Sequence, residues 1–199
     1  MVMPIILASG STIRADMLRN ANVEFSVIAA QVDEDLLKKS MTDENALPRD
    51  IADALADLKA HEVSGKAPEK LVIGCDQVLD FKGHLMSKPD SPNRAFEQLC
   101  ALRAASHSLF SAAVIYQDQV PVWRHVGQVR LHMRDATDAY LKDYVDRNWD
   151  SIRHCVGAYL LEKEGVRLFD RIDGDYFTVL GMPLLEILNY LTQQRVIAG

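Results

Sequence analysis

The start of the chain constrains the fold most strongly, because it reads as a buried strand that turns directly into a helix. The run Ile5–Ala8 is uninterrupted apolar sequence, which is typical of a strand buried on both faces. The loop Ser9–Ser11 contains only small residues, and apolar residues recur at helical spacing after it. Ser11 is the predicted N-cap, since its hydroxyl can accept a hydrogen bond from a first-turn amide.

Further strands and helices alternate along the chain. We predict helices that begin at or just after Pro48, Pro92, Thr137 and Pro183. We predict strands at residues 25–30, 71–74, 109–116, 120–133, 158–161 and 166–169, with a hairpin about Lys82–Gly83. Because strand–helix units are mixed with hairpins, the fold class expected is α/β with a mixed, twisted sheet and flanking helices. We expect one domain over residues 1–199, with two lobes around a central cleft as a possible subdivision.

Composition and charge exclude several classes of partner. Hydrophobic residues make up 48% of the chain and the net charge is −6, which disfavours nucleic acid and anionic membranes as partners. Cys75, Cys100 and Cys155 lack metal-ligand or CxxC spacing, so we expect free thiols. The apolar start is too short for a signal peptide or a membrane span, which favours a cytoplasmic location.

The loop Ser9–Ser11 together with Arg14 is the first candidate binding site. Free amides at a helix N-terminus attract an anion, and a guanidinium can grip phosphate oxygens through two hydrogen bonds. Arg14 lies three residues after Ser11, so it can face the same end of the helix. The alternative is an ordinary capped helix with an exposed arginine, and spacing alone leaves both open.

Acidic residues form the second candidate site. We predict that Asp76 ends the strand that begins at Leu71, where ligands of α/β proteins gather. Asp33 and Glu34 follow the strand predicted at residues 25–30, and such carboxylates suit Mg²⁺ or Mn²⁺. A turn-forming aspartate and a solvated acidic turn are the alternatives. Lys88 is either a phosphate ligand or a solvated lysine.

The order of short motifs resembles the Maf family of proteins. Residues 8–14 resemble its A-S-x-S-x-R-R signature, and further matches follow in order at Val32–Glu34, Leu58–Ala60, Gly74–Val78, Ser87–Pro89, Gly157–Tyr159 and Gly174–Leu184. Together they extend over nearly the whole chain. The resemblance implies a fold like that of Maf proteins and inosine triphosphate pyrophosphatase. It also implies a nucleotide pyrophosphatase that cleaves a nucleoside triphosphate into a monophosphate and pyrophosphate.

Roles for individual residues follow from the same resemblance. It implies that Asp76 is the catalytic acid or base, that Glu34 assists with metal or water, and that both hold a divalent cation, Mg²⁺ or Mn²⁺. It implies that phosphate is bound by Arg14, Lys59 and Lys88, with Ser9 and Ser11 lining the loop. Many members of the family are dimers, so a homodimer is expected.

Three departures from the family pattern support a second hypothesis. Ile13 replaces the first arginine of the signature, Gln77 replaces a threonine, and residues 151–156 differ from the family segment before Gly157. These three departures are also compatible with a degenerate Maf-like protein that binds nucleotide, or regulates division, with little hydrolysis. The motifs do not indicate which base is recognised.

Overall fold

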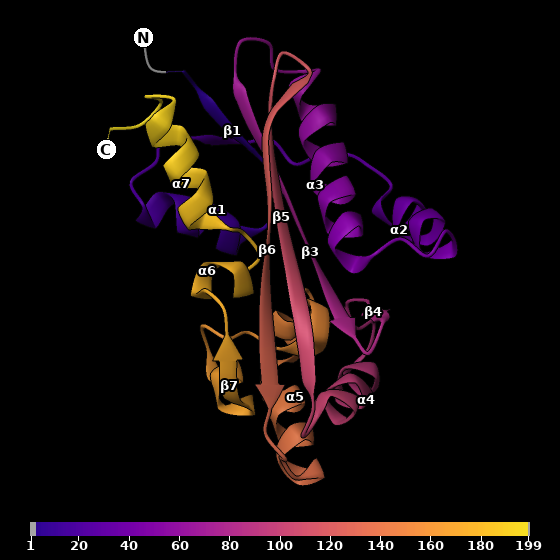
Figure 1. Ribbon diagram of the computed structural model, residues 1–199. Helices are drawn as coiled ribbons and strands as arrows, with labels where there is room; N and C mark the ends of the chain where they lie inside the picture. The colour runs from indigo at the N-terminus through magenta and orange to yellow at the C-terminus, as the bar shows by residue number, and fades with distance from the viewer. Residues whose placement is uncertain (1–2, 199) are drawn as a thin grey trace. The chain divides into compact units, whose positions relative to one another are not determined.

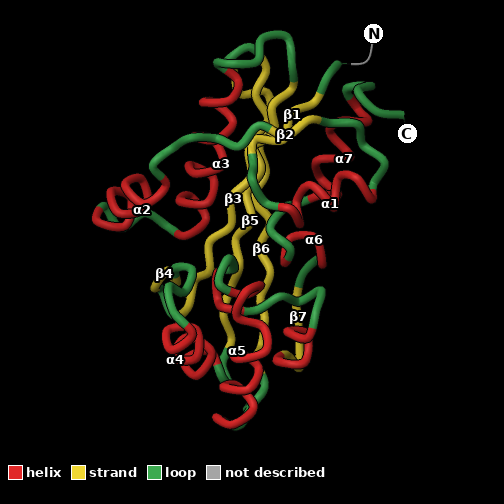
Figure 2. Tube along the Cα trace, turned by 180° about the vertical axis from the view of Figure 1, so that it is seen from behind, coloured by secondary structure: helices red, strands yellow, loops and turns green. Residues whose placement is uncertain are grey.

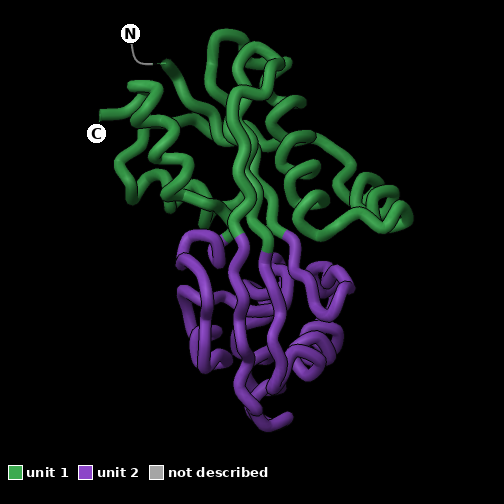
Figure 3. Tube along the Cα trace, in the orientation of Figure 1, with its two compact units in different colours: residues 1–77, 110–127, 181–199 green, residues 78–109, 128–180 purple. Residues whose placement is uncertain are grey.

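The computed structural model describes residues 3–198, which form two compact units (Figure 3). Unit 1 comprises residues 1–77, 110–127 and 181–199, and unit 2 comprises residues 78–109 and 128–180. The strands form one seven-stranded sheet in the order β2-β1-β3-β5-β6-β7, with β4 paired to β3. Because parallel and antiparallel pairs occur together, the predicted mixed α/β fold is confirmed.

The strands are β1 (Ile5–Ala8), β2 (Ser26–Val27), β3 (Leu71–Phe81), β4 (His84–Met86), β5 (Ser106–Gln117), β6 (Val120–Met133) and β7 (Phe169–Asp173). The helices are α1 (Thr12–Asn20), α2 (Glu34–Asp43), α3 (Pro48–Ser64), α4 (Pro92–Leu102), α5 (Asp138–Ile152), α6 (Tyr176–Val179) and α7 (Leu184–Gln193). Two short 3₁₀ helices, η1 (Val156–Ala158) and η2 (Glu164–Leu168), complete the elements (Figure 1).

Unit 1 is built around β1, which is parallel to both of its neighbours. Ile5 to Ala8 pair with Leu71 to Gly74 of β3, and the short β2 lies on the other side of β1. All four β1 side chains are buried, as expected for a parallel strand covered on both faces. In unit 1, α3 lies on one side of the strands, and α1 and α7 lie on the other (Figures 1 and 2).

Gly74 sets the distance between β3 and α3. A Cβ at this position would lie 2.2 Å from the carbonyl oxygen of Ala56 and 2.7 Å from the amide nitrogen of Ala60. The helix backbone therefore packs directly on the strand, and only glycine leaves enough space. Ala56, Lys59, Ala60 and Val63 share the buried face of α3, because residues three and four apart lie on one side of a helix.

Unit 2 has its own apolar core between its strands and α4 and α5. The core includes Leu79, Leu99, Val129 and Tyr144, all at most 1% exposed. His107 is buried among these elements, and its Nε2 lies 2.8 Å from the hydroxyl oxygen of Tyr159. Burial lowers the pKa of His107 to about 4, so the imidazole is neutral at pH 7 and its Nε2 can accept a hydrogen bond from the hydroxyl of Tyr159.

Several expectations about local structure were wrong. The strand expected at 25–30 covers only Ser26–Val27, and Glu34 begins a helix instead of following a strand end. The strand from Leu71 does not stop at Asp76 but continues to Phe81. Residues 158–161 form no strand, because φ is positive at Gly157 and Ala158, and most of the segment 166–169 belongs to η2.

The expectations about the helix starts, the hairpin and the cysteines are confirmed. The four predicted helices start where the sequence placed them, and the hairpin about Lys82–Gly83 forms between β3 and β4. Cys75, Cys100 and Cys155 are free thiols. Within residues 3–198, no helix combines the length and apolar character that a membrane crossing requires.

Candidate active site

The corner between β1 and α1 presents hydroxyls and amides from a short loop. Ser11 caps α1, with its hydroxyl oxygen 3.5 Å from the amide of Arg14, as predicted. Ser9 is buried, and its hydroxyl accepts from the amide of Ser11 at 3.3 Å. The first turn of α1 carries no acidic residue, so the partial positive charge of the helix N-terminus is not neutralised from within the helix.

Lys59 and Asp76 form a buried ion pair between α3 and β3. The Nζ of Lys59 lies 2.6 Å from Oδ1 of Asp76, and the two side chains are 10% and 7% exposed. Asp76 lies on the same face of β3 as Gly74, because alternate residues of a strand point to one side. The close approach of α3 at Gly74 therefore brings the lysine within reach of the carboxylate.

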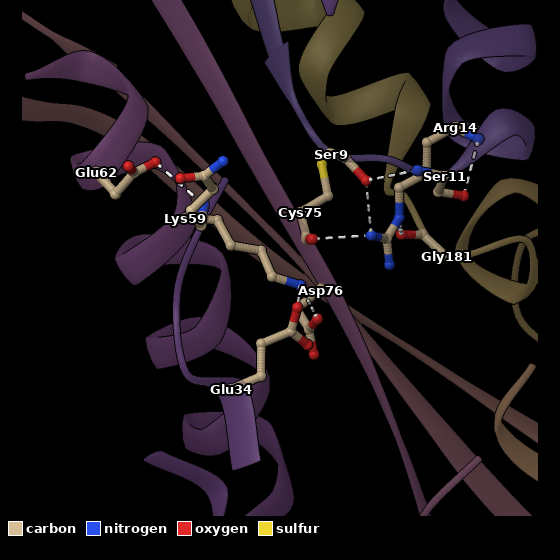
Figure 4. Close-up of polar contacts among 10 residues, drawn as sticks. Ser9, Ser11, Arg14, Glu34, Lys59, Glu62, Cys75, Asp76 and Gly181 are labelled. Carbon is tan, nitrogen blue, oxygen red and sulfur yellow. Dashed lines mark hydrogen bonds and ion pairs between the residues drawn. The ribbon is translucent and has the colours of Figure 1, made fainter. Parts of the chain in front are cut away.

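Glu34 is the third member of this cluster, and it comes from the start of α2. Its Oε1 lies 3.0 Å from the Nζ of Lys59, and its side chain is 37% exposed. Asp33 is the N-cap of α2, since its carboxylate accepts from the amide of Leu36 at 2.9 Å. Figure 4 shows Glu34, Lys59 and Asp76 pointing toward one another. The paired acids therefore have separate roles, because one caps the helix and the other enters the site.

The cluster has one ammonium for two carboxylates, which leaves an excess negative charge. Oδ2 of Asp76 is buried and has no hydrogen-bond partner within the described residues. A buried carboxylate oxygen without a donor is unfavourable unless something else compensates its charge. No cluster of three or more His, Cys, Asp or Glu that could hold a metal occurs within residues 3–198. Mg²⁺, however, commonly uses one or two carboxylates together with substrate phosphates and water, so the residues present fit such an ion.

Arg14 is bound to the protein through most of its guanidinium. Its Nε donates to the carbonyl oxygen of Gly181 at 2.8 Å. Its Nη1 donates to the carbonyl oxygen of Cys75 at 2.9 Å and to the hydroxyl of Ser9 at 3.3 Å. These contacts join the β1–α1 loop, strand β3 and the segment before α7, as the dashed lines of Figure 4 show.

The thiol of Cys75 does not supply a nucleophile at this site. Cys75 is fully buried, and burial raises the pKa of its thiol to about 11, although Arg14 and Lys59 oppose the shift. The thiol therefore stays protonated at neutral pH, and only a thiolate is an effective nucleophile.

Comparison with known proteins agrees with the motif order. A sequence model of the family described as Maf-like protein matches residues 4–194. The chain belongs to the Maf family. It is 63% identical over 193 residues to the nucleoside triphosphate pyrophosphatase of Ruegeria sp. (strain TM1040), covering 97% of each chain. It is also 39% identical over 199 residues to the 7-methyl-GTP pyrophosphatase of Brucella abortus biovar 1 (strain 9-941), covering 100% of each.

Most of the Maf motif residues singled out from the sequence lie in unit 1. Glu34, Lys59 and Asp76 are in direct contact, and a second group of contacts joins Ser9, Ser11 and Arg14. Lys88 belongs to unit 2, where it is exposed in the loop after β4. Burial raises the pKa of Cys155 to about 11, and the positive charge of Lys88 opposes this shift. A phosphate-binding role for Lys88 therefore stays a prediction.

Sequence reasoning missed two backbone groups that bind Arg14. The carbonyl oxygens of Cys75 and Gly181 accept hydrogen bonds from Arg14. A backbone acceptor cannot be predicted from the pattern of side chains. Gly181 has φ of +100°, and a Cβ there would lie 3.3 Å from Nη2 of Arg14. The glycine of the V-L-G-M-P-L segment was the one sequence signal that could have indicated this contact, because glycine tolerates both the positive φ and the close guanidinium.

Proposed function

We propose that this chain hydrolyses the α–β phosphoanhydride of a nucleoside triphosphate and releases a nucleoside monophosphate and pyrophosphate. The observation that supports the proposal best is the cluster in which the partly exposed Glu34 and the buried Asp76 share the ammonium of Lys59. Relatives that cover nearly the whole chain at 60% and 63% identity carry the name nucleoside triphosphate pyrophosphatase, which agrees with this reading.

In this proposal, Glu34 and Asp76 would hold a divalent cation, Mg²⁺ or Mn²⁺. A bound cation supplies charge neutralisation for the phosphates, which carry most of the charge in this reaction. The partnerless Oδ2 of Asp76 supports the assignment, since it is an oxygen ligand without a competing donor among the described residues. The 37% exposure of the Glu34 side chain leaves its carboxylate accessible from solvent.

Asp76 would also act as the general base of hydrolysis. It would take a proton from a water molecule as the water oxygen bonds to phosphorus, and the anhydride P–O bond would break to release pyrophosphate. Lys59 holds Oδ1 of Asp76, so it would orient the carboxylate toward the water rather than bind phosphate. This differs from the phosphate-binding role that the family resemblance implies for Lys59.

The N-terminus of α1 would contribute to phosphate binding. Ser9 and Ser11 lie before its first turn, and the helix dipole favours an anion there. Lys88 would add a positive charge to the phosphates, as the family resemblance implies. Ile13 removes one cation from the signature, so this helix N-terminus would carry more of the binding than in members with two arginines.

A panel of nucleoside triphosphates, assayed for pyrophosphate release with Mg²⁺ or Mn²⁺, tests the proposal. 7-Methyl-GTP belongs in the panel because two relatives at 39% identity carry the name 7-methyl-GTP pyrophosphatase. We expect turnover of at least one substrate, and its absence with retained nucleotide binding would support the degenerate-protein hypothesis instead.

Asp76→Asn tests the role of the carboxylate. We expect kcat to fall by at least about a hundredfold, because a general base typically contributes 10² to 10⁴ in rate. Asp80→Asn is the matched control on the same strand, where Oδ1 accepts from the amide of Gly83 and an asparagine keeps that acceptor. Equal activity of the two variants would refute the assignment of Asp76.

We also propose a homodimer, as the family resemblance implies, and a cytoplasmic location, as the sequence of the apolar start favours. Sedimentation equilibrium of the purified chain and fractionation of cells that express it test these two points.

A further inference from the structure

Arg14 is the residue whose geometry fits its expected role least well. A guanidinium grips phosphate best through two parallel N–H donors on one edge. Arg14 has five such donors, and three of them are already directed at Gly181, Cys75 and Ser9. The guanidinium has two edges that can bind phosphate through a pair of N–H groups, Nε with Nη2 and Nη1 with Nη2. Because Nε and Nη1 already donate to the protein, neither edge is free. Only the two N–H groups of Nη2 remain.

The carbonyl of Cys75 explains why the protein uses an arginine here. The parallel pairing of β1 with β3 ends at Ala8 and Gly74, and the chain then leaves the sheet at Ser9. Strand β3 continues for seven residues beyond Gly74 without β1 beside it. The next carbonyl, that of Cys75, accepts from Arg14 at 2.9 Å. The guanidinium thus supplies the donor that a longer β1 would have supplied.

This contact acts on the backbone directly before Asp76. Cys75 and Asp76 share a peptide unit, so a donor that fixes the Cys75 carbonyl also fixes the backbone from which the Asp76 side chain extends. The Nε–Gly181 bond and the close packing of Gly181 hold the guanidinium itself in place. Lys59 then holds the other end of Asp76, at Oδ1.

We propose that Arg14 is a positioning residue, which holds the peptide before Asp76 in place of a β1 strand partner, and not a bidentate phosphate ligand. The kinetic consequence rests on the pyrophosphatase function proposed above. The effect of Arg14 on the backbone at Cys75 does not rest on that function, because Arg14 binds the Cys75 carbonyl whether or not the chain hydrolyses a nucleotide.

Arg14→Lys tests the proposal, because lysine keeps the charge but can serve only part of the three acceptors. We expect kcat to fall by about tenfold to a hundredfold, as loss of a charge-assisted hydrogen bond predicts. We expect KM, and the affinity for a triphosphate with a non-hydrolysable α–β methylene bridge, to stay within about threefold. Amide hydrogen exchange at Ser9–Ser11 and at Cys75–Gln77 should become faster, while exchange in α5 stays unchanged.

Two further variants complete the test. Arg19→Lys is the matched control, since Arg19 lies on the same helix and forms an exposed pair with Asp16, and it should change neither rate nor exchange. Gly181→Ala presses a Cβ against the guanidinium without removing it, and it should give the same exchange pattern.

The outcomes separate this inference from the proposed function. Unchanged exchange at Cys75–Gln77 in Arg14→Lys, or an affinity loss for the methylene analogue above about tenfold, would overturn the positioning role. Faster exchange in a protein with no turnover of any triphosphate would support the positioning role and refute the proposed function.

Discussion

Replacing Lys59 by methionine is the sharpest test of the buried charge cluster. Methionine is similar in length and apolar, so the packing of α3 on β3 is largely kept while the ammonium is lost. Asp76 is then left as a carboxylate that is 7% exposed, with neither of its oxygens bound to a donor among the described residues. Stability, and not only activity, should therefore respond to this change.

The size of the effect follows from the distance and the burial. At 2.6 Å, two unit charges attract by about 6 kcal/mol at an effective dielectric constant of about 20. Part of this attraction offsets the desolvation of the two groups, and measured losses on removing one partner of a buried pair are about 3–5 kcal/mol. We expect Lys59→Met to lower the free energy of unfolding at pH 7 by that amount.

Urea unfolding of four proteins measures it: wild type, Lys59→Met, Asp76→Asn and the double variant. The double variant should recover much of the loss, because it removes the unpaired charge together with its partner. Lys66→Met is the control, since Lys66 pairs with Glu62 on the surface and its side chain is 54% exposed, so its loss should be below about 1 kcal/mol. Equal losses for Lys59→Met and Lys66→Met would refute the reasoning.

Two further predictions concern packing and pH. Gly74→Ala should destabilise the protein by about 3 kcal/mol or more, because its Cβ would lie 2.2 Å from the Ala56 carbonyl oxygen; an unchanged melting temperature would contradict this. His107 protonates near pH 6.5 when unfolded but only near pH 4 when folded, so its burial reduces stability as the pH falls below 6.5. Between pH 7 and pH 5, the free energy of unfolding of wild type should fall by about 2 kcal/mol more than that of His107→Gln. His154 is exposed, so His154→Gln should behave like wild type. Parallel curves of stability against pH for all three proteins would refute the prediction.

The β1–α1 unit and the later helices could be predicted because their signals are local. Ser11 and Thr137 cap α1 and α5 through their own side chains, and Pro48 and Pro92 mark helix starts by their backbone chemistry. These effects act within one turn and need no tertiary partner. The family resemblance implied that Glu34 and Asp76 hold one cation and that Lys59 binds phosphate. The ion pairs of Lys59 with both carboxylates were not predicted, since the three residues are far apart in sequence.

The structure around Glu34 and Asp76 was mispredicted for two different physical reasons. Helix α2 has no buried residue, so it lacks the apolar stripe from which a helix is recognised. In β3, the polar pair Asp76–Gln77 looks like the end of a strand, but the strand is held by sheet pairing and becomes apolar again at Val78 and Leu79. A charged residue such as Asp76 inside a buried strand can be explained only when its ion-pair partner, Lys59, is known.

Helix α3 is packed tightly on the sheet and α2 is not, so the charges that the two helices carry can change at different rates among related proteins. Two of the three charges stand on elements locked together by backbone contact at Gly74, so they tolerate little change. Glu34 is carried by a helix with no buried side chain, whose exposed residues include Leu36 at 66%. Substitutions along α2 can therefore shift one carboxylate while the core of unit 1 is untouched. The cation affinity proposed for this cluster would in this way change between relatives faster than fold stability does.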